Sequence, residues 1–245
     1  ISPLQVESYT ELHIIPIGQL NAINFETLVI SYKDKQSFKD VTWMINDYEI
    51  SNGINLPVRK RGKKITSDSL LILAPGFQND FKAISSSNQI AVSSTPWTQK
   101  LAQELGKRQH SLLLSGGQIT IEQWNQNNKN KDILHIGSHV EIDKSNPLNS
   151  KILLNSNGYG IPFFDIYTSE LNSNLVVLAG CETGLGQEVN TKEFLSIAHA
   201  FQYAGAEELI QSIWKIDDES TNLILKDFYS PVSYTHLTLP TKPSV

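Results

Sequence analysis

Short apolar runs recur along the chain, and within most of them the apolar residues are continuous rather than alternating with polar ones. Runs of this kind predict strands that are covered on both faces, as in a parallel sheet. The predicted strands occupy residues 12–17, 70–75, 111–116, 132–138, 174–180 and 208–214.

Segments with helical periodicity separate several of these strands. In residues 95–106 a Thr-Pro pair precedes apolar residues at fourfold spacing, and Gly106 follows as a stop signal. Residues 191–205 carry one apolar stripe and end in a glycine, and residues 217–229 begin with acidic residues before Leu223, Ile224 and Phe228. The alternation of strands and helices predicts a layered α/β domain with right-handed crossovers.

Three polar or irregular segments interrupt this pattern. Residues 76–95 are rich in Ser and Asn and are predicted to form a long surface loop. The basic cluster "RKRGKK" at 59–64 is typical of a solvated loop or hairpin more than of a binding patch. The end of the chain, 230–245, resembles translated read-through of a sequencing adapter, so we expect a non-native tail after a domain spanning 1–229.

Composition narrows the possible functions. The 245 residues are 40% hydrophobic, which suffices for one sizeable core, and the net charge of −5 gives little support for binding nucleic acid or an anionic membrane. One cysteine excludes an internal disulfide framework and suits a reducing compartment. No apolar run approaches the roughly 18 residues of a membrane-spanning helix, and no signal peptide opens the chain. We therefore expect a cytoplasmic protein.

The only cysteine, Cys181, directly follows the apolar run "NLVVLAG", and one of the six histidines, His139, ends the run "DILHIGSH". A cysteine nucleophile requires a base or a cation to hold it as thiolate, and histidine is the usual supplier. Neighbouring parallel strands would bring Cys181 and His139 to the same height at one edge of the sheet. His135 lies about 13 Å deeper along its strand and is predicted to be a hydrogen-bonded core histidine.

Other interpretations of these residues are weaker. A lone cysteine at the end of a strand is also compatible with buried packing. The glycines of "GCETGLG" lack the third glycine and the Lys-Ser/Thr of a phosphate loop. His135 and His139 would form a zinc pair on a helix, but the apolar residues around them predict a strand. The sequence therefore implies neither a metal nor an organic cofactor.

Several strings together carry a family resemblance. "ILHIGSH", "NLVVLAGCETGLG", "AFQYAGAEELIQSIWKIDDESTNLILKDFY" and the upstream "LHIIPIGQLNAINFETLV" resemble the CHAT domain over about residues 12–229. CHAT domains are caspase-like cysteine peptidases that are often fused to tetratricopeptide repeats. The resemblance implies a caspase-like layered α/β fold with a mostly parallel sheet flanked by helices, and a catalytic dyad of His139 and Cys181. It also implies a protein or peptide substrate and regulation by an N-terminal repeat or other fused domain, so we expect the chain to be truncated at both ends.

Two positions depart from the family pattern. The family has glycine after the catalytic histidine, where this chain has Val140, and alanine before the cysteine, where it has Gly180. The backbone N–H groups of Val140 and Cys181 would stabilise the oxyanion, but valine does not easily adopt a positive φ. The alternative function is therefore a catalytically inactive caspase-like scaffold for protein–protein interaction and signalling.

The string "KIDDES" raises the question of substrate specificity. Asp217 or Asp218 is expected to cap the last helix, since aspartate is a preferred N-cap residue. A carboxylate in this loop could also enter the specificity pocket and pair with a basic P1 side chain. The two roles are compatible if one aspartate caps the helix and the other points into the pocket.

Overall fold

The structure is a computed structural model, and it describes residues 10–15, 20, 23–31, 37–52, 69–77, 79, 81–84, 89–143, 147–179, 197, 200–212 and 217–230. The chain divides into two compact units. The described residues up to 52 belong to the first unit, and those from 69 to 230 belong to the second.

The first unit contains two small sheets. In one, β1 (Glu11–Ile14) pairs in parallel with β4 (Glu49–Asn52), and in the other β2 (Val29–Ser31) pairs antiparallel with β3 (Thr42–Trp43). This unit also contains the short helices η3 (Phe25–Thr27), η4 (Phe38–Asp40) and α1 (Met44–Asp47). β1 is the strand predicted at residues 12–17, but its side chains alternate between exposed and half-buried, so it is not covered on both faces.

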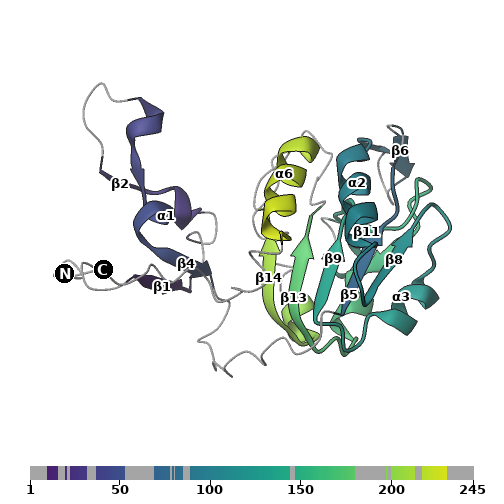
Figure 1. The fold of residues 1–245 in the computed structure, drawn as a ribbon. Coiled ribbons are helices and arrows are strands. Elements are labelled where there is room, and N and C mark those ends of the chain that lie inside the picture. The colour runs from purple at the N-terminus through teal and green to yellow at the C-terminus, as the bar shows by residue number, and fades with distance from the viewer. Residues whose placement is uncertain are drawn as a thin grey trace. The chain divides into compact units, whose positions relative to one another are not determined.

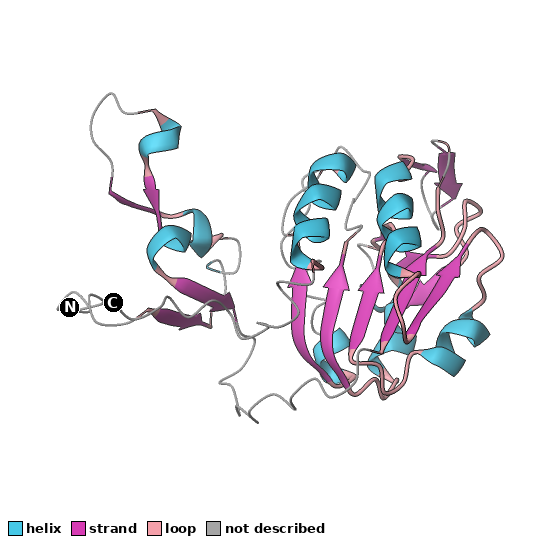
Figure 2. Cartoon of the chain, in the orientation of Figure 1, coloured by secondary structure: helices cyan, strands magenta, loops and turns pink. Residues whose placement is uncertain are grey.

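The second unit is built on a five-stranded parallel sheet (Figure 2). In spatial order its strands are β14 (Ala206–Gln211), β13 (Ser173–Leu178), β9 (Ile133–Ile136), β5 (Leu70–Ala74) and β8 (Ser111–Ser115). Five of the six apolar runs thus form the predicted parallel sheet, and the layered α/β fold is confirmed.

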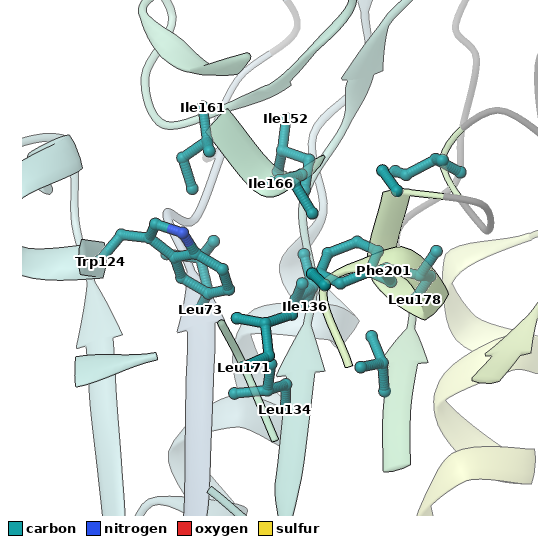
Figure 3. Close-up of a cluster of buried hydrophobic side chains, with 14 of the residues drawn as sticks. Leu73, Trp124, Leu134, Ile136, Ile152, Ile161, Ile166, Leu171, Leu178 and Phe201 are labelled. Atoms are coloured by element: carbon teal, nitrogen blue, oxygen red, sulfur yellow. The ribbon is translucent and has the colours of Figure 1, made fainter. Parts of the chain in front are cut away.

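Helices cover both faces of this sheet. On one face α2 (Pro96–Leu105) and α6 (Asp218–Phe228) pack side by side (Figure 1). Their apolar side chains meet Ile72 and Val177 of the sheet in one buried cluster. The opposite face is covered by α3 (Ile121–Asn127), α4 (Phe163–Tyr167) and the helical residues 200–203. Figure 3 shows this second cluster, in which Trp124, Ile166 and Phe201 surround Leu134 and Ile136 of β9.

Two small antiparallel sheets extend the second unit. β6 (Phe81–Ile84) and β7 (Gln89–Val92) form a hairpin, so the prediction of a long surface loop over residues 76–95 is wrong. The two strands pair in register, with Phe81 opposite Val92 and Ile84 opposite Gln89. β10 (Val140–Glu141), β11 (Lys151–Leu153) and β12 (Gly160–Pro162) form the other sheet, with η5 (Pro147–Asn149) between β10 and β11.

The ends of the main helices agree with their sequence signals. α2 has Thr95 as N-cap and Gly106 as C-cap, and the helical segment before β14 ends at Gly205, whose φ is +101°. In α6 the buried stripe is Asn222 and Leu225, followed by Tyr229 after the helix, whereas Leu223 and Ile224 are 58% and 70% exposed. The predicted apolar face of this helix was therefore only partly correct.

One aspartate joins the starts of three strands in the parallel sheet. Asp132, just before β9, accepts hydrogen bonds from the Ser69 hydroxyl at 2.7 Å and from the Asn174 side-chain amide at 3.0 Å. Ser69 directly precedes β5, and Asn174 lies at the start of β13. These bonds fix the relative register of the three central strands at the edge opposite to their carboxyl ends.

Some predictions fall on residues that the structure does not describe. The basic cluster at 59–64, the tail from 231 onward and Cys181 with its flanking residues 180–196 lie outside the described ranges. The part of the chain that is described contains no helix with the length and hydrophobicity needed to span a membrane.

Candidate active site

Two neighbouring strands of the parallel sheet lead to the two candidate catalytic residues in the sequence. β9 and β13 pair in parallel with Ile136 opposite Leu178, and the Ala179 N–H continues the ladder by donating to the Ile136 carbonyl at 2.8 Å. His139 lies three residues beyond Ile136, and Cys181 lies three residues beyond Leu178. The condition on which the expected dyad depends, that the two strands are neighbours, is thus met. Cys181 itself lies outside the described residues.

The segment Gly137–His139 leaves β9 and is tied down along its length. The Gly137 N–H donates to the Leu73 carbonyl at 2.8 Å, which anchors the segment to β5. The Ser138 hydroxyl donates to the carbonyl of Leu153 in β11, and the Leu153 N–H donates to the His139 carbonyl at 2.9 Å. Each residue of the segment is thus attached to a neighbouring strand, so the imidazole is carried by a fixed backbone.

The His139 ring is buried, with 2% of the residue exposed, and its contacts include a main-chain carbonyl and an aromatic ring. Its Nε2 lies 2.8 Å from the carbonyl oxygen of Ser93, and its ring centroid lies 4.9 Å from that of Phe77. A carbonyl can only accept a hydrogen bond, so Nε2 carries the proton, and in the neutral ring Nδ1 is then unprotonated. The Ser93 carbonyl thus selects the tautomer in which Nδ1 can accept a proton.

Val140 lies in extended strand conformation and is not among the described residues with a positive φ. The bond from Leu153 to His139 makes the pair of Val140 and Ile152 a non-hydrogen-bonded one in the β10–β11 ladder. The Val140 N–H therefore points away from β11. This orientation keeps the N–H out of the hairpin ladder without requiring the backbone conformation that favours glycine.

Asp217 and Asp218 hold the starts of two different helices. Asp217 is the N-cap of α6 and accepts from the Ser220 N–H at 2.8 Å, as one of the two aspartates was expected to do. This bond lowers the pKa of Asp217 below its usual value. Asp218 reaches across to α2, where its carboxylate accepts from the N–H groups of Trp97 and Thr98 at 2.8 and 3.1 Å.

His135 is fully buried in β9, and its Nδ1 lies 3.0 Å from the hydroxyl of Tyr229. The two rings meet edge to face, with centroids 5.5 Å apart. The prediction of a hydrogen-bonded core histidine is therefore confirmed. Burial lowers the pKa of His135 to about 4, so the ring is neutral at physiological pH.

This low pKa predicts a loss of stability in mild acid. The unfolded chain binds a proton at His135 below about pH 6.5, whereas the folded chain does so only below about 4. Between these values the unfolded state holds more protons, so the free energy of unfolding should fall by about 2 kcal/mol from pH 7 to pH 5 on account of this residue. Urea denaturation at the two pH values should show a smaller fall in His135→Leu. An equal fall in both proteins would contradict the assignment.

Sequence reasoning missed three residues around His139. Ser93 acts through its carbonyl, and Phe77 through its ring face, and neither contact has a signature in the sequence. Gly137 does have one, as a glycine directly after a strand in "HIGSH". A Cβ on Gly137 would lie 2.4 Å from Cγ2 of Thr98, so only glycine lets α2 approach this closely.

The described residues contain no group of three or more His, Cys, Asp or Glu side chains that could hold a metal ion. The family model of the CHAT domain matches residues 1–236, and a search of the curated proteins found no match. The five-stranded parallel sheet with helices on both faces agrees with the caspase-like layered fold of that family. The chain therefore belongs to the CHAT domain family of caspase-like peptidases.

Proposed function

We propose that the protein is a cysteine endopeptidase that cleaves peptide bonds with a dyad of His139 and Cys181. The thiol of Cys181 transfers its proton to Nδ1 of His139, and the thiolate attacks the carbonyl carbon of the scissile bond. The imidazolium then gives this proton to the leaving amine, which departs and leaves a thioester on Cys181. His139 next deprotonates a water molecule, which attacks the thioester and releases the carboxylic acid and the free thiol.

The observation that carries this proposal is the shared register of β9 and β13. His139 and Cys181 follow the paired residues Ile136 and Leu178 at the same distance along the chain. Reactive groups of a parallel sheet gather beyond the carboxyl ends of its strands, and in the sequence both residues follow such ends. The hydrogen bond from His139 Nε2 to the Ser93 carbonyl adds support, since it leaves Nδ1 as the proton acceptor.

Backbone N–H groups would stabilise the negative charge on the carbonyl oxygen. We assign this role to Val140 and Cys181, as the family resemblance implies. Val140 directly follows His139 in the chain, and its N–H points away from β11. This position suits a donor close to the reacting carbonyl.

Turnover of a diverse peptide library by the purified protein tests the proposal, with Cys181→Ser as the reference. We expect internal cleavage of peptides by the wild type and none by the variant, with both proteins folded by circular dichroism. Absence of cleavage by the wild type, together with thiol labelling that does not depend on His139, would favour the alternative of an inactive scaffold for protein–protein interaction.

We further propose that the enzyme prefers a basic residue at P1 and that the loop carrying Asp217 and Asp218 supplies the recognising carboxylate. Asp217 is exposed, whereas both carboxylate oxygens of Asp218 accept hydrogen bonds from α2. Asp217 is therefore the better placed of the two to receive a substrate cation. A carboxylate near the P1 side chain favours a basic group over a neutral or acidic one by charge complementarity.

The P1 preference can be measured by profiling the cleaved library. We expect Arg or Lys at P1 in the wild type and a loss of at least about tenfold in selectivity for them in Asp217→Asn. Asp218→Asn serves as the comparison. A preference for acidic or apolar P1 residues, or an unchanged basic preference in both variants, would contradict this assignment.

A further inference from the structure

The N-terminus of α2 is capped by a residue of another helix. Its own N-cap, Thr95, makes no side-chain capping bond. Asp218, the first residue of α6, accepts instead from the backbone N–H groups of Trp97 and Thr98, at 2.8 and 3.1 Å, and from the Thr98 hydroxyl. The first N–H groups of a helix have no partner within the helix, and a carboxylate there is also favoured by the helix dipole.

A second contact between the same helices reinforces this cap. The side-chain amide of Asn222, one turn further along α6, donates to the Trp97 carbonyl at 2.7 Å. Asn222 is 7% exposed, so this bond is shielded from water. Asp218 and Asn222 together hold the first turn of α2 at a fixed position relative to α6.

The first turn of α2 in turn contacts the segment that carries His139. With its hydroxyl bonded to Asp218, Thr98 directs its Cγ2 methyl group at Gly137, two residues before His139. Rotation of this side chain to another rotamer would move the methyl group and break the hydroxyl bond. The position of Thr98 is therefore coupled to the backbone at Gly137.

A second route leads from α2 to the ring itself. The residues just before the helix include Ser93, whose carbonyl accepts from His139 Nε2, and Thr95, whose N–H donates to the Phe77 carbonyl at 2.9 Å. Phe77 packs against the ring of His139. The Ser93 carbonyl and the Phe77 ring are thus both linked to the start of α2, Ser93 along the chain and Phe77 through its hydrogen bond with Thr95.

We infer that Asp218 is a positioning residue for His139, which rests on the proposed function of His139 as the base of the dyad. Asp218 fixes the N-terminus of α2, and that end of the helix sets the Ser93 carbonyl, Phe77 and the backbone at Gly137. Loss of the cap lets the start of α2 shift and loosens all three. The expected consequence is a misoriented imidazole and a Cys181 thiol that is less readily deprotonated.

Alkylation of the single cysteine by iodoacetamide provides a direct readout, because every labelling event in the chain reports on Cys181. The rate follows the thiolate fraction, which an adjacent imidazolium raises near neutral pH. We expect Asp218→Ala and Thr98→Val to slow labelling at pH 6.5 by about tenfold or more and to move the pH profile toward that of an ordinary thiol. His139→Ala gives the limit for a dyad that is fully broken.

Glu219→Ala is the matched control. Glu219 is the next residue in the first turn of α6, is exposed and carries the same charge, so its loss should leave the labelling profile unchanged. Thr98→Val retains the size of the side chain and replaces the hydroxyl with a methyl group, which cannot donate to Asp218. It keeps the test decisive if Asp218→Ala unfolds, and urea denaturation of each variant shows which proteins are folded.

The outcomes separate this inference from the function on which it rests. In one outcome, His139→Ala is labelled more slowly, whereas folded Asp218→Ala or Thr98→Val is labelled at the wild-type rate. This result would overturn the positioning role of Asp218 but would still support the dyad. Wild-type labelling with a changed P1 preference in Asp218→Ala would make Asp218 a substrate-binding residue instead. Equal labelling in the wild type and His139→Ala would overturn the dyad and the positioning role together.

Discussion

Replacement of His139 by alanine is expected to reduce peptide hydrolysis by about 10³-fold or more and to slow iodoacetamide labelling of Cys181 near neutral pH by about tenfold. The variant loses the group that accepts the thiol proton and later protonates the leaving amine. It also loses the imidazolium that favours the thiolate, so labelling should follow the pH dependence of an ordinary cysteine with a pKa near about 8.5. Initial rates of hydrolysis and labelling across pH 5–9 measure both effects.

His110 offers a control within the same unit. It is exposed, lies in a loop after α2 and has a φ of +62°, a conformation that asparagine tolerates. His110→Asn should therefore retain the hydrolysis rate and the labelling profile of the wild type. If His139→Ala behaved like His110→Asn in both assays, His139 would have no catalytic role.

The substitution Gly137→Ala is expected to destabilise the protein by about 1–3 kcal/mol and to lower the labelling rate of Cys181 as well. The added methyl would lie 2.4 Å from Cγ2 of Thr98, far inside van der Waals contact. Thr98 could withdraw only by giving up its hydrogen bond to Asp218, and otherwise the backbone before His139 must move. Urea denaturation measures the first effect, and iodoacetamide labelling of the folded variant measures the second.

Gly117 provides the comparison for this substitution. A Cβ placed there meets no atom within 4 Å, and its φ lies outside the left-handed region. Gly117→Ala should thus change the free energy of unfolding by less than about 0.5 kcal/mol. It should leave the labelling rate of Cys181 unchanged. A Gly137→Ala variant as stable and as reactive as Gly117→Ala would show that the close approach of α2 is not required.

The centre of the parallel sheet could be predicted because its three central strands are buried on both faces. The runs around Ile72, His135 and Val177 are almost uninterrupted in hydrophobicity, and each forms a strand of the sheet. The run at 12–17 looks the same in sequence but pairs with β4 in a two-stranded sheet and stays partly exposed. A short apolar run predicts a strand without specifying its partner, since the partner depends on distant residues.

Two other differences between the predicted and the observed structure also arise from contacts between distant residues. Residues 76–95 were predicted to be a loop from their Ser and Asn content, but cross-strand pairing of β6 with β7 outweighs that local preference. In α6 the acidic residues correctly predicted the start of the helix, and Asp217 caps it. The exposure of Leu223 and Ile224 could not be predicted, because the buried stripe of a helix is set by where the helix packs.

The candidate site was predictable as far as side-chain chemistry is visible in sequence. His139 and Cys181 stand out because each ends an apolar run. The partner that orients His139 could not be identified, because it is a main-chain carbonyl that any residue at position 93 would provide. The contact of Asp218 with α2 was hidden for a related reason, since it joins residues about 120 positions apart in the chain.

The separation between Cys181 Sγ and the nearer ring nitrogen of His139 in a crystal structure tests the central claim most directly. The matching ends of β9 and β13 and the tautomer set by Ser93 predict that this nitrogen is Nδ1 and that it lies within about 3–6 Å of the sulfur. A separation beyond about 10 Å in a well-ordered site would contradict the dyad and with it the proposed peptidase activity.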